Sequence, residues 1–268
     1  MIRRIAALLG KELAELRGNL SVVIPAMITG AISIAIPFGI AIAVPYFSGE
    51  RLSDSSDFRT ALAMYRNVPT MRGLDPEAAI QAMIFQQFLV LLLLTPVTGA
   101  MSIAAYAVIG EKQGRTLEPL LATPLTTFEL LAAKVLGSFL PGLALVTVCF
   151  AIYVGGAKQL AAPGVYRTLF DARGLLTIFL LGPLASLAAL QLAVCVSSRV
   201  NDARSAQQIG ALVILPISML VVAEFTNSLQ LTGTVILRMS SYLVVLNAML
   251  MAVAIRLFDR ESILTRWK

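Results

Sequence analysis

Long apolar segments bounded by charged residues alternate along the chain. Charge-free segments run from Arg17 to Glu50, Glu77 to Glu111, Lys134 to Lys158, Arg173 to Arg199, Arg204 to Glu224 and Arg238 to Arg256. A helix needs about 20 apolar residues to cross the hydrocarbon core of a bilayer. The pattern therefore predicts an all-α membrane protein with a single domain over residues 1–268 and six spanning helices: near 20–44, 75–109, 130–156, 174–196, 206–225 and 236–256.

Residues 1–18 follow a different pattern, in which apolar side chains recur every three or four positions. Ile2, Ile5, Leu9, Leu13 and Leu16 fall on one face, and most of the charged residues lie elsewhere around the helix. This spacing is typical of an amphipathic helix that lies in the headgroup region before the first span. A cytoplasmic extension of that span is the alternative interpretation.

A polar segment, residues 46–76, separates the first two predicted spans and is predicted to be an outer loop. The next helix starts at its end, because Asp75 suits the cap, Pro76 the first helical position and Glu77 the first turn. Thr95-Pro96 predicts a kink further along that helix, because proline lacks the N–H group that a helix interior requires.

Composition indicates that lipid surrounds most of the chain. Hydrophobic residues make up 58% of the 268 positions and charged residues 13%, and the mean hydropathy is +0.84. Soluble domains carry about 25% charged residues. If this chain were soluble, its low share of charged residues would leave large apolar patches facing water. We therefore expect a multi-pass membrane protein.

Basic residues orient the predicted spans. With the N-terminus inside, the cytoplasmic segments hold 13 of the 21 Lys and Arg residues: four before Leu20, three within 110–134, Arg199, Arg204 and four at the C-terminal end. Positive charge gathers on the cytoplasmic side of membrane proteins. Six spans then place both termini in the cytoplasm. No basic cluster with interleaved aromatic residues suggests a nucleic-acid partner.

The residue types exclude several kinds of chemistry. The chain contains no histidine, which removes histidine-based catalysis and histidine ligation of zinc or haem. Cys149 and Cys195 both lie in predicted spans, so a disulfide framework or a cysteine-based metal site is not expected. We predict no catalytic residue, no metal site and no cofactor bound by this chain.

The loop at residues 110–129, between the second and third predicted spans, gathers charge and proline. A capping threonine and three leucines at helical spacing predict a short amphipathic helix: Thr116, Leu117, Leu120 and Leu121. Pro124 ends that helix, because the residue before a proline avoids the helical region. Thr126 and Glu129 have the spacing of a capping box that begins the third span. Such a stiff helix either transmits force from a partner or only connects two spans.

The same loop resembles the cytoplasmic loop of type-2 ABC-transporter permeases, a prokaryotic family of six-span membrane subunits. The residues that match the family's pattern in order are Glu111, Thr116, Leu117, Glu118, Leu120, Leu121, Thr123, Pro124, Glu129 and Lys134. Arg115 stands where the family usually has glycine. The C-terminal run RLFDRESILTRWK and the amphipathic start extend the resemblance over nearly the whole chain.

The resemblance implies an exporter permease of the cytoplasmic (inner) membrane of a prokaryote, acting as a homodimer with two ATP-binding cassette subunits. Residues 1–18 would be its elbow helix and 110–129 its coupling loop. The implied ATPase-coupling residues are Glu111, Arg115, Thr116, Leu117, Glu118, Leu121, Pro124 and Glu129. The chain has no G-x-x-x-x-G-K-[ST] phosphate loop. We therefore expect ATP and Mg²⁺ to bind the partner subunit, and this chain not to be an enzyme by itself.

Polar residues within the spans are candidates for the translocation path. A weakly polar stripe follows one face of the second span: Gln87, Thr95, Thr98, Ser102 and Tyr106. The resemblance favours a face toward the path, and close packing through small and hydroxyl residues is the alternative. Glu224 and Arg238 flank the last outer turn, as a structural ion pair or as an exit gate. Three other polar residues are expected to form interhelical hydrogen bonds: Gln86, Gln191 and Asn247.

Other functions fit the pattern less well. No acidic residue lies near the middle of a predicted span, where proton- or sodium-coupled carriers place an ionisable group. That argues against an autonomous channel or carrier and for an external energy source. An intramembrane enzyme would lack an activating base for its nucleophile. A membrane anchor that recruits an ATPase without transporting anything is the remaining alternative.

Overall fold

The computed structural model describes residues 2–18, 23–55, 73–113, 126–197, 214–226 and 231–257, together with positions 58, 208 and 212. The regular elements in these residues are all helical: α1 (Ile2–Gly18), α2 (Ile24–Phe38), the π-helix η2 (Gly39–Ala43), α3 (Val44–Ser48), the 3₁₀ turn η3 (Leu52–Asp54), α5 (Pro76–Phe88), the 3₁₀ segment η5 (Leu89–Leu93), α6 (Leu94–Gln113), α8 (Thr127–Leu160), α9 (Val165–Thr168), α10 (Ala172–Leu176), the π-helix η6 (Thr177–Leu181), α11 (Gly182–Ser197), α13 (Ile214–Phe225) and α14 (Gly233–Leu257).

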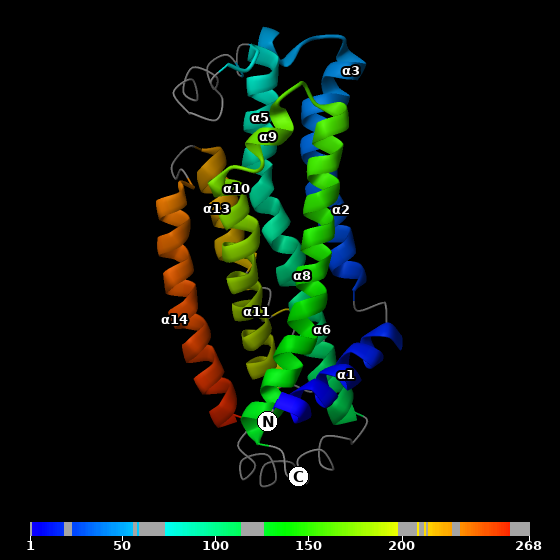
Figure 1. Ribbon diagram of the computed structural model, residues 1–268, viewed down its shortest axis with the longest axis vertical. Helices are drawn as coiled ribbons and strands as arrows, with labels where there is room; N and C mark the ends of the chain where they lie inside the picture. Colours follow the sequence, from blue (N-terminus) through cyan, green and yellow to red (C-terminus); the bar gives the residue numbers. More distant parts are fainter. Residues whose placement is uncertain are drawn as a thin grey trace.

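The helices form one elongated bundle (Figure 1). α1 crosses obliquely over one end of it, where α6 ends and α8 begins, and α3 lies at the opposite end. We call these the α1 end and the α3 end. α2 and α14 lie on two sides of the bundle, with α6, α8 and α11 between them. The first described residue of α1 and the last of α14 therefore lie at the same end.

Five helical segments are long and apolar enough to cross a membrane: Ile24–Ser48, Pro76–Ala104, Phe128–Leu160, Ala172–Val196 and Gly233–Leu257. They correspond to the first four and the last of the predicted spans, which confirms an all-helical membrane protein. For the prediction at 206–225, the described residues contain only a shorter apolar helix, Ile214–Glu224. The count of six therefore stays a prediction.

Each departure of a described spanning helix from α geometry lies just before a proline, although Pro37 and Pro141 lie within regular α-helix. A proline ring crowds the carbonyl four residues earlier and removes one helical hydrogen bond. The residue four places before Pro45 lies in η2, the one before Pro96 lies in η5, and the one before Pro183 lies in η6. The irregularity predicted at Thr95-Pro96 is thus seen as the 3₁₀ segment that precedes it.

Side-chain hydroxyl groups supply further bonds near these irregular turns. Ser33 Oγ of α2 donates to the carbonyl of Leu91 in η5 at 3.1 Å, and Thr98 Oγ1 donates to the carbonyl of Leu94 at 2.8 Å. Lipid offers no hydrogen-bond partner, so an unsatisfied backbone group in a membrane costs several kcal/mol. These hydroxyl groups therefore find their hydrogen-bond partners in the backbone of the spans.

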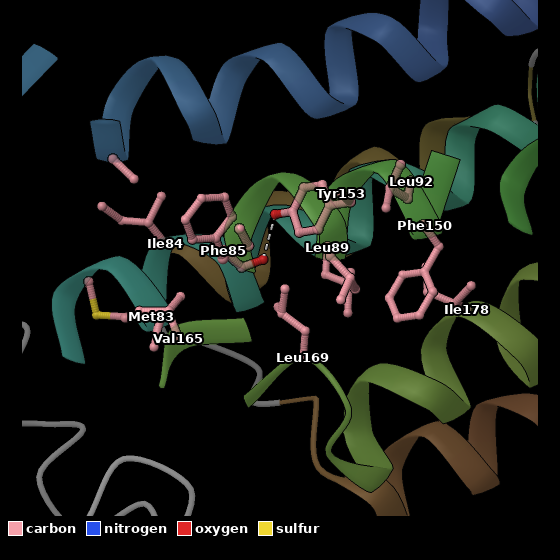
Figure 2. Close-up of a cluster of buried hydrophobic side chains, with 14 of the residues drawn as sticks. Met83, Ile84, Phe85, Leu89, Leu92, Phe150, Tyr153, Val165, Leu169 and Ile178 are labelled. Atoms are coloured by element: carbon pink, nitrogen blue, oxygen red, sulfur yellow. Dashed lines mark hydrogen bonds between the residues drawn. The ribbon is translucent and has the colours of Figure 1, made fainter. Parts of the chain in front are cut away.

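An aromatic cluster joins α2, α5 and α8 toward the α3 end. Phe38, Phe85 and Tyr153 pack edge to face, with ring centroids 4.9 to 5.8 Å apart. Phe85 and Tyr153 are fully buried. Figure 2 shows the Tyr153 hydroxyl donating to the carbonyl of Phe85, at 2.8 Å. Gly156, one turn along α8, lies against the Phe38 ring, where an added Cβ would come within 2.7 Å of Cζ.

Gly156→Ala is expected to destabilise the bundle by about 1–3 kcal/mol, because a ring held by two others cannot move aside freely. The neighbouring Gly155 is a matched control, since a Cβ there would meet nothing within 4 Å. Gly155→Ala should leave stability unchanged or raise it by up to about 1 kcal/mol through helix propensity. Thermal unfolding in one detergent measures both variants, and equal melting temperatures would contradict the packing described for Phe38.

Candidate functional site

The first turn of α8 lies at the α1 end and follows directly on the predicted coupling loop. The Thr126 Oγ1 accepts from the Glu129 backbone N–H at 3.2 Å, and the Glu129 carboxylate accepts from the Thr126 N–H at 3.0 Å. These reciprocal bonds confirm the predicted capping box. The start of α8 is therefore fixed locally by its own sequence.

α1 attaches to this part of α8 through two ion pairs. Lys134 Nζ lies 3.1 Å from Glu12 Oε1, and both residues are buried, with relative exposures of 1% and 9%. Arg4 reaches the Glu129 carboxylate at 3.9 Å and is itself largely exposed. Two ion pairs thus join α1 to the first turns of α8. The Glu12–Lys134 pair is buried, and the Arg4–Glu129 pair lies near the surface.

A glycine lets the two helices approach closely. A Cβ added to Gly137 would lie 2.8 Å from Cβ of Glu12 and 3.8 Å from the Leu9 side chain. Real Cβ atoms essentially never come within 3 Å of another heavy atom. α1 therefore rests directly on the backbone of α8, one turn beyond Lys134.

Sequence reasoning assigned no role to Glu12 and matched Lys134 only through the family resemblance. A signal was present in the spacing, because Glu12 lies three residues after Leu9 and four before Leu16. Those intervals place it on the apolar face of the amphipathic helix. A carboxylate on such a face needs a buried cation, and Lys134 is the one that the structure supplies.

Of the predicted ATPase-coupling residues, the structure describes the surroundings of Glu129 and the helical backbone of Glu111. α6 continues to Gln113, beyond the predicted end of the second span near residue 109, whereas α8 begins at Thr127, where the predicted capping box places it. The other predicted residues lie outside the described part of the chain: Arg115, Thr116, Leu117, Glu118, Leu121 and Pro124. Their role stays a prediction.

The predicted ion pair near the α3 end needs a correction. Glu224 is buried at the end of α13 and pairs with Arg173 of α10. Arg238 is exposed on α14, and these two described residues, Glu224 and Arg238, do not form the ion pair that was expected. The carboxylate points into the bundle, where tertiary packing places α10. Arg238 was expected as the partner of Glu224 because the two flank one turn in the sequence, whereas the fold places Arg173 beside Glu224.

Two of the other polar residues form the expected interhelical hydrogen bonds. Gln86 Nε2 donates to the carbonyl of Thr168 at 3.1 Å, and Asn247 Nδ2 donates to the carbonyl of Leu184 at 3.0 Å. Each bond ties a span to a backbone carbonyl of another helix. Gln191 is buried in α11, and its partner stays a prediction.

A small basic and aromatic cluster lies where α8 ends, near the α3 end. Lys158 Nζ is 6.0 Å and Arg167 Cζ is 5.9 Å from the ring centroid of Tyr166. Arg167 Nε donates to the Tyr166 hydroxyl at 3.3 Å. That hydrogen bond, and then the guanidinium charge, lower the pKa of Tyr166. Tyrosine with basic neighbours is typical of the boundary between membrane and water.

The family follows from comparison with known proteins. Residues 63–262 match the family described as "ABC-2 family transporter protein". The chain belongs to the ABC-2 transporter family. The match covers most of the chain and contains four of the five spanning segments, and no curated protein matches it. This ABC-2 permease is a membrane transport subunit, and its family implies partnership with an ATP-binding subunit.

The polar stripe of the ABC-2 permease lies at several depths in the bundle. Thr95 is fully buried against Gly30 of α2, which fits the packing alternative for this residue. Ser102 is also buried, Gln87 and Thr98 are half-buried, and Tyr106 is exposed. A role in the path stays a prediction for the stripe, and Gln87 and Thr98 are its most accessible members within the spanning segment.

The capping box of α8 predicts a graded effect of substitution at Thr126. Thr126→Ala should destabilise the permease by about 1 kcal/mol, because it leaves a backbone donor of the first turn without its partner. Thr126→Ser keeps the hydroxyl and should retain most of the stability. Thermal unfolding of the two variants in the same detergent tests this. A serine variant as unstable as the alanine variant would mean that the threonine methyl group, and not the cap, matters here.

Proposed function

We propose that this ABC-2 permease exports its substrate across the cytoplasmic membrane of a prokaryote by alternating access, driven by a separate ATP-binding subunit. One observation carries the proposal: the family match over residues 63–262 falls on a chain without a phosphate-loop motif. A transport subunit that lacks this motif needs its ATP hydrolysed by another polypeptide.

The proposed assembly contains two copies of the permease, as a homodimer, and two ATPase subunits that bind ATP and Mg²⁺. Both termini are proposed to be cytoplasmic, so that the α1 end faces the ATPases. The distribution of basic residues supports this orientation. Arg4 and Lys11 of α1 and Arg256 of α14 all belong to helix segments at the α1 end (Figure 1).

Coupling is proposed to occur through residues 110–129. ATP binding closes the two ATPases, their movement pushes the loop, and the push reaches α6 and α8 together. Two features support this role. The loop joins the ends of two long helices, and the capping box fixes the residue at which α8 begins. A fixed start of α8 suits the transmission of force from the loop.

The cargo is proposed to be amphipathic, because the spans that would line its route are mostly apolar. Gln87 and Thr98 are proposed as path residues. Gln87 lies in α5 and Thr98 in α6, and each is half-buried within a single chain. A second copy of the permease would then enclose the route from the other side.

The combined substitution Glu118→Arg and Pro124→Gly is expected to release the ATPase from the permease. Charge reversal at a docking surface juxtaposes like charges, which costs several kcal/mol, and glycine removes the rigidity of the loop. Co-purification should fall by about tenfold or more. The matched control is Glu50→Arg, an exposed reversal near the α3 end, which should leave co-purification unchanged. Full retention of the ATPase by the loop variant would contradict docking at this loop.

Cysteines at Gln87 and Thr98 test the path directly. In a background with Cys149→Ala and Cys195→Ala, each introduced thiol should react with an aqueous maleimide at a rate that depends on the nucleotide bound to the ATPase. Val148→Cys serves as a control, because that side chain is exposed on α8 and is expected to face lipid. If the two path positions stay unreactive in every nucleotide state, the stripe serves helix packing.

A further inference from the structure

We infer that Glu12 and Lys134 are positioning residues, which join α1 and the first turns of α8 into one body that moves as a unit. The source of the movement rests on the proposed function, because it comes from the ATPase acting on the loop before α8. The joining itself rests only on the geometry of α1 and α8.

The burial of the Glu12–Lys134 pair is the first argument. Both side chains are nearly inaccessible, and the two charges lie 3.1 Å apart. A buried ion pair rarely stabilises a protein more than an apolar pair of the same volume would. An amphipathic helix that only anchored the chain to the membrane would therefore need no such pair. Buried charges do fix register, because a buried charge has to meet a charge of the opposite sign.

The second argument is that α1 is held at two separate points. Arg4 and Glu12 are eight residues apart, or about 12 Å along a helix, and they reach Glu129 and Lys134 of α8. One contact would leave α1 free to pivot, whereas two contacts fix its angle. At Gly137 the two helices are so close that no side chain fits between Glu12 of α1 and the backbone of α8.

The third argument is the position of these contacts relative to the coupling loop. The Glu129 carboxylate accepts from the Thr126 N–H and also lies near Arg4. The residue that caps α8 is therefore shared between the end of the loop and α1. Any displacement of the loop that tilts the start of α8 has to carry α1 with it, or else break a buried ion pair.

Distances between spin labels test the inference without a variant of the pair. Both labelled permeases carry Cys149→Ala and Cys195→Ala, so that only the introduced cysteines are labelled. The first has labels at Ala14→Cys of α1 and Leu140→Cys of α8. The second has labels at Ala14→Cys of α1 and Ala252→Cys of α14. These positions are exposed or partly exposed. Dilution with unlabelled permease leaves at most one labelled copy per complex. The α1–α8 distance should be the same in nucleotide-free and ATP-trapped complexes, and the α1–α14 distance should shift.

Variants of the pair test the joining in the permease alone, with no ATPase present. Lys134→Met leaves Glu12 buried without its cation, and the narrow α1–α8 distance distribution should broaden. The charge-reversed permease, Glu12→Lys with Lys134→Glu, should restore a narrow distribution. Glu15→Gln is the matched control, because it removes the exposed pair of Lys11 and Glu15 on the same helix and should change nothing.

Each outcome either supports or overturns the inference. An α1–α8 distance that changes with nucleotide, or an α1–α14 distance that does not change while ATP is hydrolysed, would overturn the common movement. A narrow distribution in Lys134→Met would overturn the joining. Failure of the proposed function looks different, since no ATPase would then bind the unmodified permease, and the variants of the pair would still decide whether the two helices are joined.

Discussion

Lipid offers the backbone no hydrogen-bond partner, and the architecture of this permease follows from that constraint. The five spanning segments within the described residues are helical, because only a helix satisfies its backbone groups within itself. Three prolines interrupt α geometry, and each π or 3₁₀ segment within a described span contains the residue whose carbonyl one of them crowds. The hydroxyls of Ser33 and Thr98 then donate to nearby backbone carbonyls. Polar residues in these spans serve the backbone first, so a polar residue alone is weak evidence for a substrate path.

Charge obeys the same constraint and therefore gathers where α1 meets α8 and where α10 meets α13. Glu12 with Lys134, and Glu224 with Arg173, are buried carboxylates that each meet a cation. In both cases removal of the cation would leave a buried carboxylate without it, and the cost of that exceeds the stability that the pair contributes. The pair at the α1 end has an additional consequence. It lies within two turns of the capping box that follows the proposed coupling loop, so α1 and α8 together hold the end of the bundle at which a partner is proposed to act.

The sequence predicted those features that depend on neighbours along the chain. Hydropathy located the spanning segments, and the spacing of Thr126 and Glu129 predicted the cap of α8. Features that depend on packing were harder to predict. Glu12 and Lys134 are 122 positions apart, and only the misplaced charge on the apolar face of the first helix signals that a partner exists. The partner of Glu224 was assigned to Arg238 because that residue is near in sequence, whereas α10 brings Arg173 to it in space. The sequence showed the helical spacing of the polar stripe in the second span but could not show how deeply each residue is buried. Burial varies from the fully buried Thr95 to the exposed Tyr106.

The central claim is that a separate ATPase acts on the α1 end of this membrane subunit. The most direct measurement isolates the tagged permease gently from its native host, determines the ratio of each protein that co-purifies, and assays ATP hydrolysis by the complex in lipid nanodiscs. The account predicts one phosphate-loop ATPase per permease, with hydrolysis abolished when the phosphate-loop lysine is substituted. A permease that purifies alone and allows ATP-independent flux in liposomes would contradict the account.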